Sequence, residues 1–131
     1  MPKALTPVHC VAFPLLTIAV LDGFTEAEQE DLCNTIVALS GDGGLFAVSD
    51  ETAATNWNET MDWFKSMDYK EAIATAIKCC DTIHEKITNE NARNAIIGFI
   101  VDTVNADDKV TEQEKILAGM FTTVILNGSK S

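Results

Sequence analysis

The chain contains the same acidic helix entrance twice, and this repeat restricts it to a fold with two related helical halves. The first copy runs from Asp22 to Glu28, and the second runs from Asp107 to Glu114. In each copy an acidic turn leads to an apolar residue, then to a threonine, and three positions later to a glutamate. Threonine and glutamate at this spacing form a capping box, in which each side chain binds a backbone N–H of the helix start. The repeat therefore predicts two helix pairs, each enclosing one loop that bears carboxylates.

Apolar residues recur at spacings of three and four along most of the chain, which is the pattern of one face of an α-helix. No stretch shows the sustained alternation of a half-buried strand. The expected helices run from Thr6 to about Leu21, from Thr25 to the glycine cluster at 41–44, from about Glu51 to Ser66, from Asp68 to about Ile87, from near Asn89 to near Asn105, and from Thr111 to before Asn127. We expect an all-α fold, a compact bundle of about six to seven helices with an internal two-fold pseudo-repeat. It forms a single domain, 1–131, with halves at about 6–66 and 68–127.

The net charge of −11, with a lone arginine at Arg93, restricts the partners of the chain. Such a charge opposes binding to phosphate backbones and to anionic lipid surfaces. We therefore expect no nucleic-acid partner, whereas cations and basic protein surfaces remain suitable partners.

The apolar run from Val11 to Leu21 predicts a core helix rather than a targeting or membrane segment. It has no small-residue cleavage site, and it is shorter than the roughly 20 residues that span a bilayer. The cysteines show no Cys-x-x-Cys spacing, which favours buried, reduced thiols in a cytoplasmic protein. They are Cys10, Cys33, Cys79 and Cys80.

The acidic motifs carry the candidate chemistry. Five carboxylates and no basic residue lie between Asp22 and Asp31, and five carboxylates with one lysine lie between Asp102 and Glu114. Two carboxylates about 4 Å apart repel each other by roughly 4 kcal/mol at an effective dielectric constant of 20, so such a cluster favours a proton or a cation. Oxygen ligands select hard ions, Ca²⁺ before Mg²⁺ or Mn²⁺. The candidate metal ligands are Asp22, Glu28, Asp107, Asp108 and Glu114.

A purely structural role stays open for each of these residues. Glu28 and Glu114 can cap their own helices, because acidic side chains are favoured in a first helical turn. Asp22 and Asp107 have no capping role from their positions, although aspartate often serves in turns. For Glu28 and Glu114, both a role as metal ligand and a role as helix cap therefore stay open.

Other polar residues give weaker signals. Asp42 lies in a glycine cluster that lacks the spacing of a nucleotide loop or an EF-hand, so we expect a linker there. His9 and His84 are expected to be structural or exposed, because neither has a second ligand at metal-binding spacing. Trp57, Trp63 and Phe64 are expected to belong to the core, with Trp63 partly exposed. No serine or cysteine lies in a nucleophile motif. We expect no enzymatic activity, and an enzyme that uses paired carboxylates is the third alternative.

The second motif with its preceding residue, Ala-Asp-Asp-Lys-Val-Thr-Glu-Gln-Glu at 106–114, resembles the signature Ala-Asp-Gly-x-(Ile/Val)-(Ser/Thr)-x-x-Glu of tellurite-resistance TerB-like domains. The first motif is similar but one residue shorter, and Asp108 stands where the family usually has glycine. The resemblance implies a helical fold with internal pseudo-symmetry, an acidic metal-binding face, and a role in tellurite or general stress response through protein partners at the membrane. The alternative is a metal-free acidic scaffold that recruits a basic partner.

Overall fold

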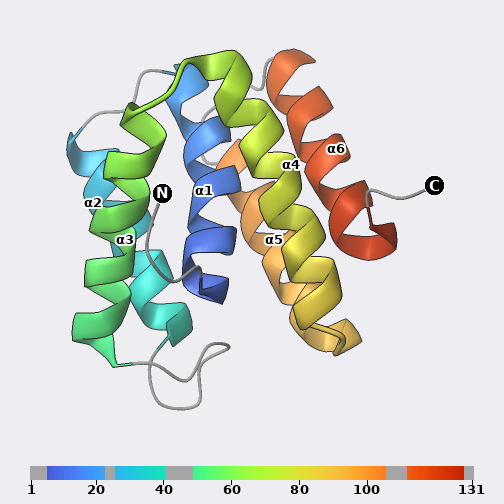
Figure 1. Cartoon of the computed structure of the whole chain (residues 1–131), viewed down its shortest axis with the longest axis horizontal. Helices are drawn as coiled ribbons and strands as arrows, with labels where there is room; N and C mark the ends of the chain where they lie inside the picture. Colours follow the sequence, from blue (N-terminus) through green and yellow to red (C-terminus); the bar gives the residue numbers. More distant parts are fainter. Residues whose placement is uncertain (1–5, 23–25, 41–48, 106–111, 129–131) are drawn as a thin grey trace.

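A computed structural model of the chain describes residues 6–22, 26–40, 49–105 and 112–128. Within these ranges it contains α-helices and one short 3-10 helix, with no strand, which confirms the all-α class. The elements are α1 (Pro7–Ala19), η1 (Val20–Asp22), α2 (Glu26–Ser40), α3 (Asp50–Lys65), α4 (Tyr69–Lys86), α5 (Glu90–Asn105) and α6 (Glu112–Asn127). Figure 1 shows these helices running alternately up and down. The ends of α1, α3 and α5 and the starts of α2, α4 and α6 therefore lie at the upper end of the molecule.

Helix α1 lies at the centre of the fold. Every residue from Val8 to Ile18 is buried, as expected for a helix that is apolar around its whole circumference. It contacts each of the other α-helices. Helices α4, α5 and α6 lie on one side of α1 and form a four-helix arrangement with it. Helices α2 and α3 pack together on the other side of α1 (Figure 1). The predicted core helix is confirmed.

Local sequence signals determine where several helices begin. The hydroxyl of Thr6 accepts a hydrogen bond from the backbone of α1, and Pro7 occupies the first helical position, where its missing N–H costs nothing. Ser49 caps α3 in the same way. The carboxylate of Asp68 accepts from the backbone N–H of Glu71 at 2.8 Å at the start of α4. The predicted boundaries agree with the observed ones because these caps are local.

Aromatic side chains join α1 to α3. The ring centroids of Phe13 and Trp63 are 4.7 Å apart, and those of Phe13 and Phe64 are 5.5 Å apart, both in tilted arrangements. Trp57 is buried and Trp63 is partly buried, as predicted. The hydroxyl of Tyr69, at the start of α4, donates to the carbonyl of Thr17 near the end of α1. These contacts attach α3 and α4 to the central helix.

The apolar pattern and the glycines of the last two helices are poor guides to their packing. Ile116 and Met120 share the apolar pattern of the core residues, yet their side chains are 58% and 37% exposed. Glycine inside a helix can allow a neighbouring helix to approach closely, but a Cβ atom at Gly98 or Gly119 would meet nothing within 4 Å. The reason is that α5 and α6 lie at the outside of the fold, so each buries only part of its apolar circumference. The two-fold pseudo-repeat stays a prediction.

Candidate functional site

The first acidic motif begins where the central helix ends. Asp22 is the last residue of η1, and Glu28 lies in the first turn of α2. The side chains of both residues lie outside the part of the chain that the structure describes, as does Thr25, the predicted cap. The backbone therefore places the motif at the upper end of the molecule, at the α1–α2 junction (Figure 1).

The second acidic motif contributes the one candidate ligand whose side chain is described. Glu114 lies in the first turn of α6, and its side chain is 1% exposed. Asp107, Asp108 and the predicted cap Thr111 lie outside the described residues. A buried carboxylate needs compensation, which helix-terminal N–H groups, a proton or a cation can supply. The burial of Glu114 is therefore compatible with both roles predicted for it, helix cap and metal ligand.

The described helix ends that flank the two motifs lie at the same end of the molecule. The end of η1 and the start of α2 lie at the upper end in Figure 1, and so do the end of α5 and the start of α6. Helix α1 also contacts both α5 and α6. Among the described residues alone, no three His, Cys, Asp or Glu side chains form a group that could hold a metal ion. Any such group at this end would need at least one carboxylate whose side chain lies outside the described residues, such as those of residues 22, 28, 107 and 108.

A buried polar cluster joins the start of α1 to α3, and the sequence did not predict it. His9 is buried, and its Nδ1 accepts a hydrogen bond from the backbone N–H of Thr6 at 3.0 Å. Because a backbone N–H can only donate, a neutral His9 ring carries its proton on Nε2. This Nε2 lies 3.3 Å from Oε1 of Glu59. The amide of Asn56 donates to the Thr6 hydroxyl at 3.4 Å. His9 thus takes the place that glutamate has in an ordinary capping box.

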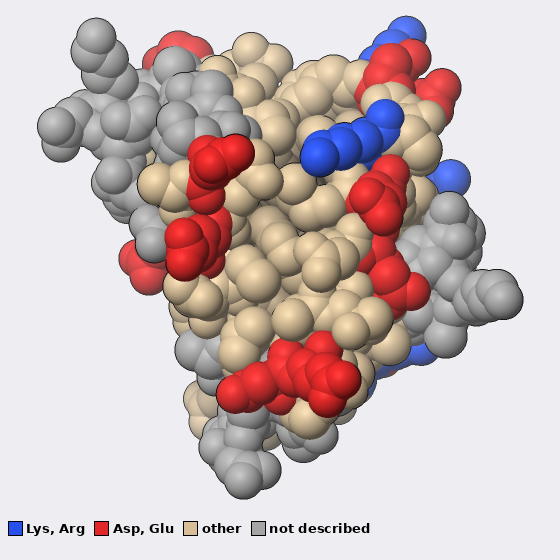
Figure 2. Space-filling view, turned by 90° about the vertical axis from the view of Figure 1, so that its left-hand side faces the viewer, with Lys and Arg blue, Asp and Glu red and all other residues tan. Residues whose placement is uncertain are grey.

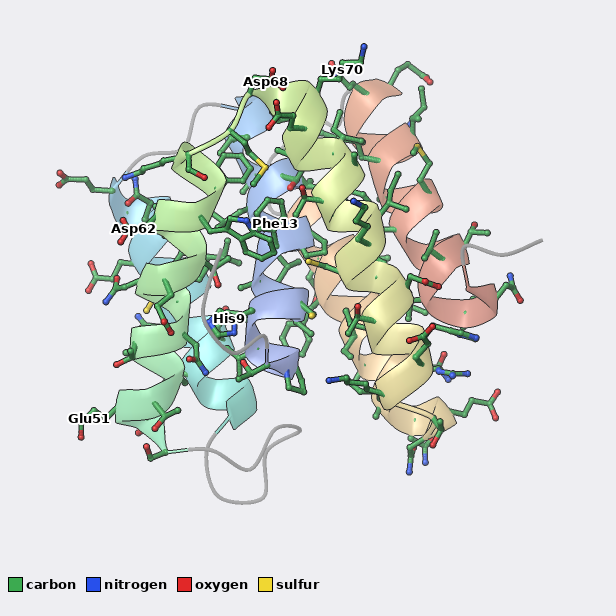
Figure 3. All side chains as sticks on the ribbon, in the orientation of Figure 1. His9, Phe13, Glu51, Asp62, Asp68 and Lys70 are labelled. Atoms are coloured by element: carbon green, nitrogen blue, oxygen red, sulfur yellow. The ribbon has the colours of Figure 1, made fainter. Side chains whose placement is uncertain are left out.

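Figure 3 shows His9 and Phe13 on the same side of α1, between that helix and α3. The cluster leaves its histidine with a backbone donor on one nitrogen and a carboxylate on the other. Both nitrogens are occupied by structural hydrogen bonds, so His9 has a positioning role in the fold. The sequence signal that could have revealed it is the Thr6-x-x-His9 spacing, since an imidazole nitrogen can accept a hydrogen bond as a carboxylate does.

The second histidine and the lone arginine connect the carboxyl ends of helices. Nδ1 of His84 lies 3.0 Å from the carbonyl oxygen of Ile125, which joins α4 to α6. The guanidinium of Arg93 donates to the carbonyl oxygens of Ile87 and His84, at 2.7 and 2.6 Å. These carbonyls belong to the end of α4, where a positive charge is favoured by the helix dipole. Both residues therefore act as structural connectors at the lower end.

The cysteines differ in environment although all are reduced. Cys10, Cys79 and Cys80 are buried, whereas Cys33 is partly exposed. A hydrogen bond from Cys79 lowers the pKa of Cys10, and Lys86 adds to this effect against the opposing effect of burial. The same hydrogen bond and burial raise the pKa of Cys79. Burial also raises the pKa of Cys80.

Acidic side chains surround the outer face of α2 and α3. Figure 2 shows this face, with carboxylates at several of its edges, basic side chains at its upper right, and uncharged surface between them. Among the described side chains of the two helices, the exposed acidic residues are Glu26, Glu30, Asp50, Glu51, Glu59 and Asp62. The face presents negative charge to any partner that approaches it.

Among the helices that the structure describes, none combines the length and the hydropathy of a membrane span. The chain matches no protein-family model, and no curated protein and no solved structure is significantly similar to it.

Proposed function

We propose that the chain is a non-enzymatic, divalent-cation-binding helical domain of the TerB-like kind, acting in the cytoplasm in tellurite or general stress response. The cation site would lie at the upper end of the molecule, where the helices that flank the two acidic motifs end and begin. Its ligands would be Asp22, Glu28, Asp107, Asp108 and Glu114.

The observation that carries this proposal is the position of Glu114. A carboxylate with a 1% exposed side chain lies at the end of the molecule to which the chain also brings the first acidic motif. The similar order of residues in the two motifs supports a shared role for their carboxylates. Calcium is the preferred ion because carboxylate-rich sites suit its flexible coordination, whereas Mg²⁺ demands a stricter octahedral geometry and keeps its waters. Mn²⁺ is the next candidate because oxygen ligands also suit it.

Calorimetric titration of the full chain with Ca²⁺, after removal of bound ions by a chelator, tests the proposal. We expect saturable binding that Asp107→Asn weakens at least tenfold, because the substitution keeps the shape of the side chain and removes its charge. Asp50→Asn is the matched control, since Asp50 is exposed at the start of α3, at the opposite end of the molecule. Equal binding by both variants would contradict the assignment of Asp107, and no binding by the wild type would refute the metal site.

A metal-free acidic scaffold is the second candidate function, and the charged rim of α2 and α3 favours it (Figure 2). Its partner would be a basic protein surface. Fluorescence anisotropy with a lysine-rich peptide provides the test. The scaffold function predicts binding that weakens with salt, is unaffected by chelator, and falls when Glu30 is replaced by lysine.

A further inference from the structure

The outer side of α6 exposes a set of large apolar side chains. Four large hydrophobic side chains are exposed in the part of the chain that the structure describes, and three of them, Ile116, Met120 and Leu126, lie on α6 at 58%, 37% and 41% exposure. The fourth, Val101, lies on α5, which packs against α6. Figure 1 shows α6 at the edge of the bundle, beside α4. The exposed apolar surface is therefore concentrated at this edge.

Helix α6 is apolar on both of its sides from residue 116 onward. Its inner side buries Leu117, Phe121 and Ile125. Its outer side consists of the exposed positions from 116 to 127, which we call the α6 outer stripe: Ile116, Gly119, Met120, Thr123, Leu126 and Asn127. No acidic or basic residue occurs from 116 to 127. A helix that lacks a charged face is typical of one that is covered on both sides.

The charge of the chain indicates which partner suits this stripe. The exposed sides of other helices carry carboxylates, such as Glu30 on α2, Glu59 on α3 and Glu85 on α4. Two copies of the chain, each with a net charge of −11, repel each other where such surfaces meet. The α6 outer stripe brings no carboxylate against another, so two copies can meet there with little repulsion. A basic partner, in contrast, would gain no ion pair from this stripe.

We propose that the α6 outer stripe is a homodimer interface, in which two copies of the chain pack their α6 helices antiparallel about a two-fold axis. A two-fold interface uses the same surface of both copies, so the apolar stripe meets an identical stripe and both are removed from water. Ile116 then lies near the partner's Leu126, and Met120 lies near the partner's Thr123. An added Cβ at Gly119 would meet nothing within 4 Å, so this position leaves room for a side chain of the partner.

The length of α6 determines how strong this contact can be. The helix has 16 residues and is about 24 Å long. A contact along one helix of this length buries less than about 1,200 Å² in total, which is the range of weak and transient interfaces. We therefore expect a reversible dimer that forms at micromolar or higher protein concentrations. The dimer is independent of the proposed cation site.

Sedimentation velocity of the full chain at increasing protein concentration tests the proposal. We expect a monomer–dimer equilibrium that Gly119→Glu weakens at least tenfold, because this substitution places a carboxylate on the stripe of each copy. The added side chain has open space in the monomer, so circular dichroism should show unchanged helix content. Asn58→Glu is the matched control, since Asn58 is exposed on α3 and the substitution adds the same charge away from α6. A monomer at every concentration, or equal dimerisation of both variants, would overturn the proposal.

Salt distinguishes this interface from recruitment of a basic partner. Added sodium chloride should strengthen dimerisation, because it screens the repulsion between two acidic copies. Binding of a lysine-rich peptide to the acidic surface should instead weaken with salt. A chelator should leave the dimer unchanged. Dimerisation that weakens as salt is added would contradict an uncharged interface.

Cross-linking tests the antiparallel arrangement, in the Cys33→Ser variant that lacks the partly exposed thiol. The middle of the stripe lies near the two-fold axis, so Thr123→Cys should give a covalent dimer on oxidation that a dithiol reductant reverses. The two copies of residue 116 would lie about 16 Å apart along the helix axes. Ile116→Cys should therefore remain uncross-linked. A disulfide through position 116 would refute the antiparallel arrangement.

Discussion

Arg93, the only arginine in the chain, is expected to be a major source of stability at the lower end of the molecule. Its guanidinium donates hydrogen bonds to the carbonyls of Ile87 and His84, at 2.7 and 2.6 Å. Replacement by methionine keeps most of the aliphatic stem and removes both bonds. A hydrogen bond to a charged group contributes roughly 1.5–3 kcal/mol when buried. Because Arg93 is only half-buried, we expect a loss of about 2 kcal/mol for the pair of bonds.

This loss translates into a measurable shift in melting temperature. Unfolding entropy near 60 °C is about 2.1 cal/mol/K per residue, so a 131-residue domain loses about 7 °C for 2 kcal/mol. Arg93→Lys should recover part of the loss, because lysine keeps the charge but not the planar fork. Lys70→Met, on the exposed surface of α4, is the control and should shift the midpoint very little. If thermal unfolding gives the same midpoint for Arg93→Met and Lys70→Met, Arg93 does not connect α4 to α5 in the way described.

Other perturbations follow from the caps and the buried phenol. Thr6→Ala should lower the free energy of unfolding by about 1–2 kcal/mol, and by more than Ser49→Ala, because only the first hydroxyl also contacts a buried histidine; equal losses in urea titrations would contradict this. Gly128→Ala should lower the free energy of unfolding by about 1–2 kcal/mol, since the φ of Gly128 is 81° and a Cβ would lie 3.1 Å from the ring of His84. An unchanged urea midpoint would contradict the requirement for glycine at this position. Burial raises the pKa of Tyr69 to about 12. The contribution of its neutral phenol to the free energy of unfolding is therefore complete below the unfolded-state pKa of about 10 and is lost as pH rises through 12. Tyr69→Phe should therefore lose less stability across that interval, and parallel pH profiles would count against this interpretation.

Local signals explain why most helix boundaries could be predicted from the sequence. Thr6 with Pro7, Ser49 and Asp68 each provide a cap within a few residues of the helix that it starts. The apolar spacing that predicts the helices is equally local. The central position of α1 was predictable because the run from Val8 to Ile18 leaves no polar face for solvent.

The arrangement of side chains between helices could not be predicted in the same way. Ile116 and Met120 look like core residues, but their exposure depends on which side of α6 its neighbours α4 and α5 cover. The burial of Cys10, Cys79 and Cys80 likewise depends on the packing of α1 against α4, two helices distant in the sequence. His9 shows a third case, since a histidine at a capping position is a weaker sequence signal than a glutamate. These features depend on tertiary contacts, and the spacing of apolar residues along the sequence does not predict such contacts.

Part of the candidate site could be predicted from local sequence signals, and part depends on tertiary packing. Up-and-down helices joined by short connections are enough to predict that the helix ends flanking both acidic motifs lie at one end of the molecule. The burial of Glu114 required the structure, because a glutamate in a first helical turn is usually exposed as a solvated cap. Convergence of its carboxylate with Asp22, Glu28, Asp107 and Asp108 stays a prediction.

The most direct test of the proposed cation site is the melting temperature of the full chain in calcium and in chelator. A cation that binds only the folded state stabilises it by about 2.7 kcal/mol at 100 times its dissociation constant. For 131 residues this corresponds to an increase of about 10 °C, with a smaller increase for magnesium. Asp107→Asn should abolish most of the increase without destabilising the calcium-free protein. Glu114→Gln should have a milder effect if that residue mainly caps α6, because glutamine can still close a capping box. If the wild type and both variants melt at the same temperature with calcium and with chelator, the acidic motifs are not a specific cation site.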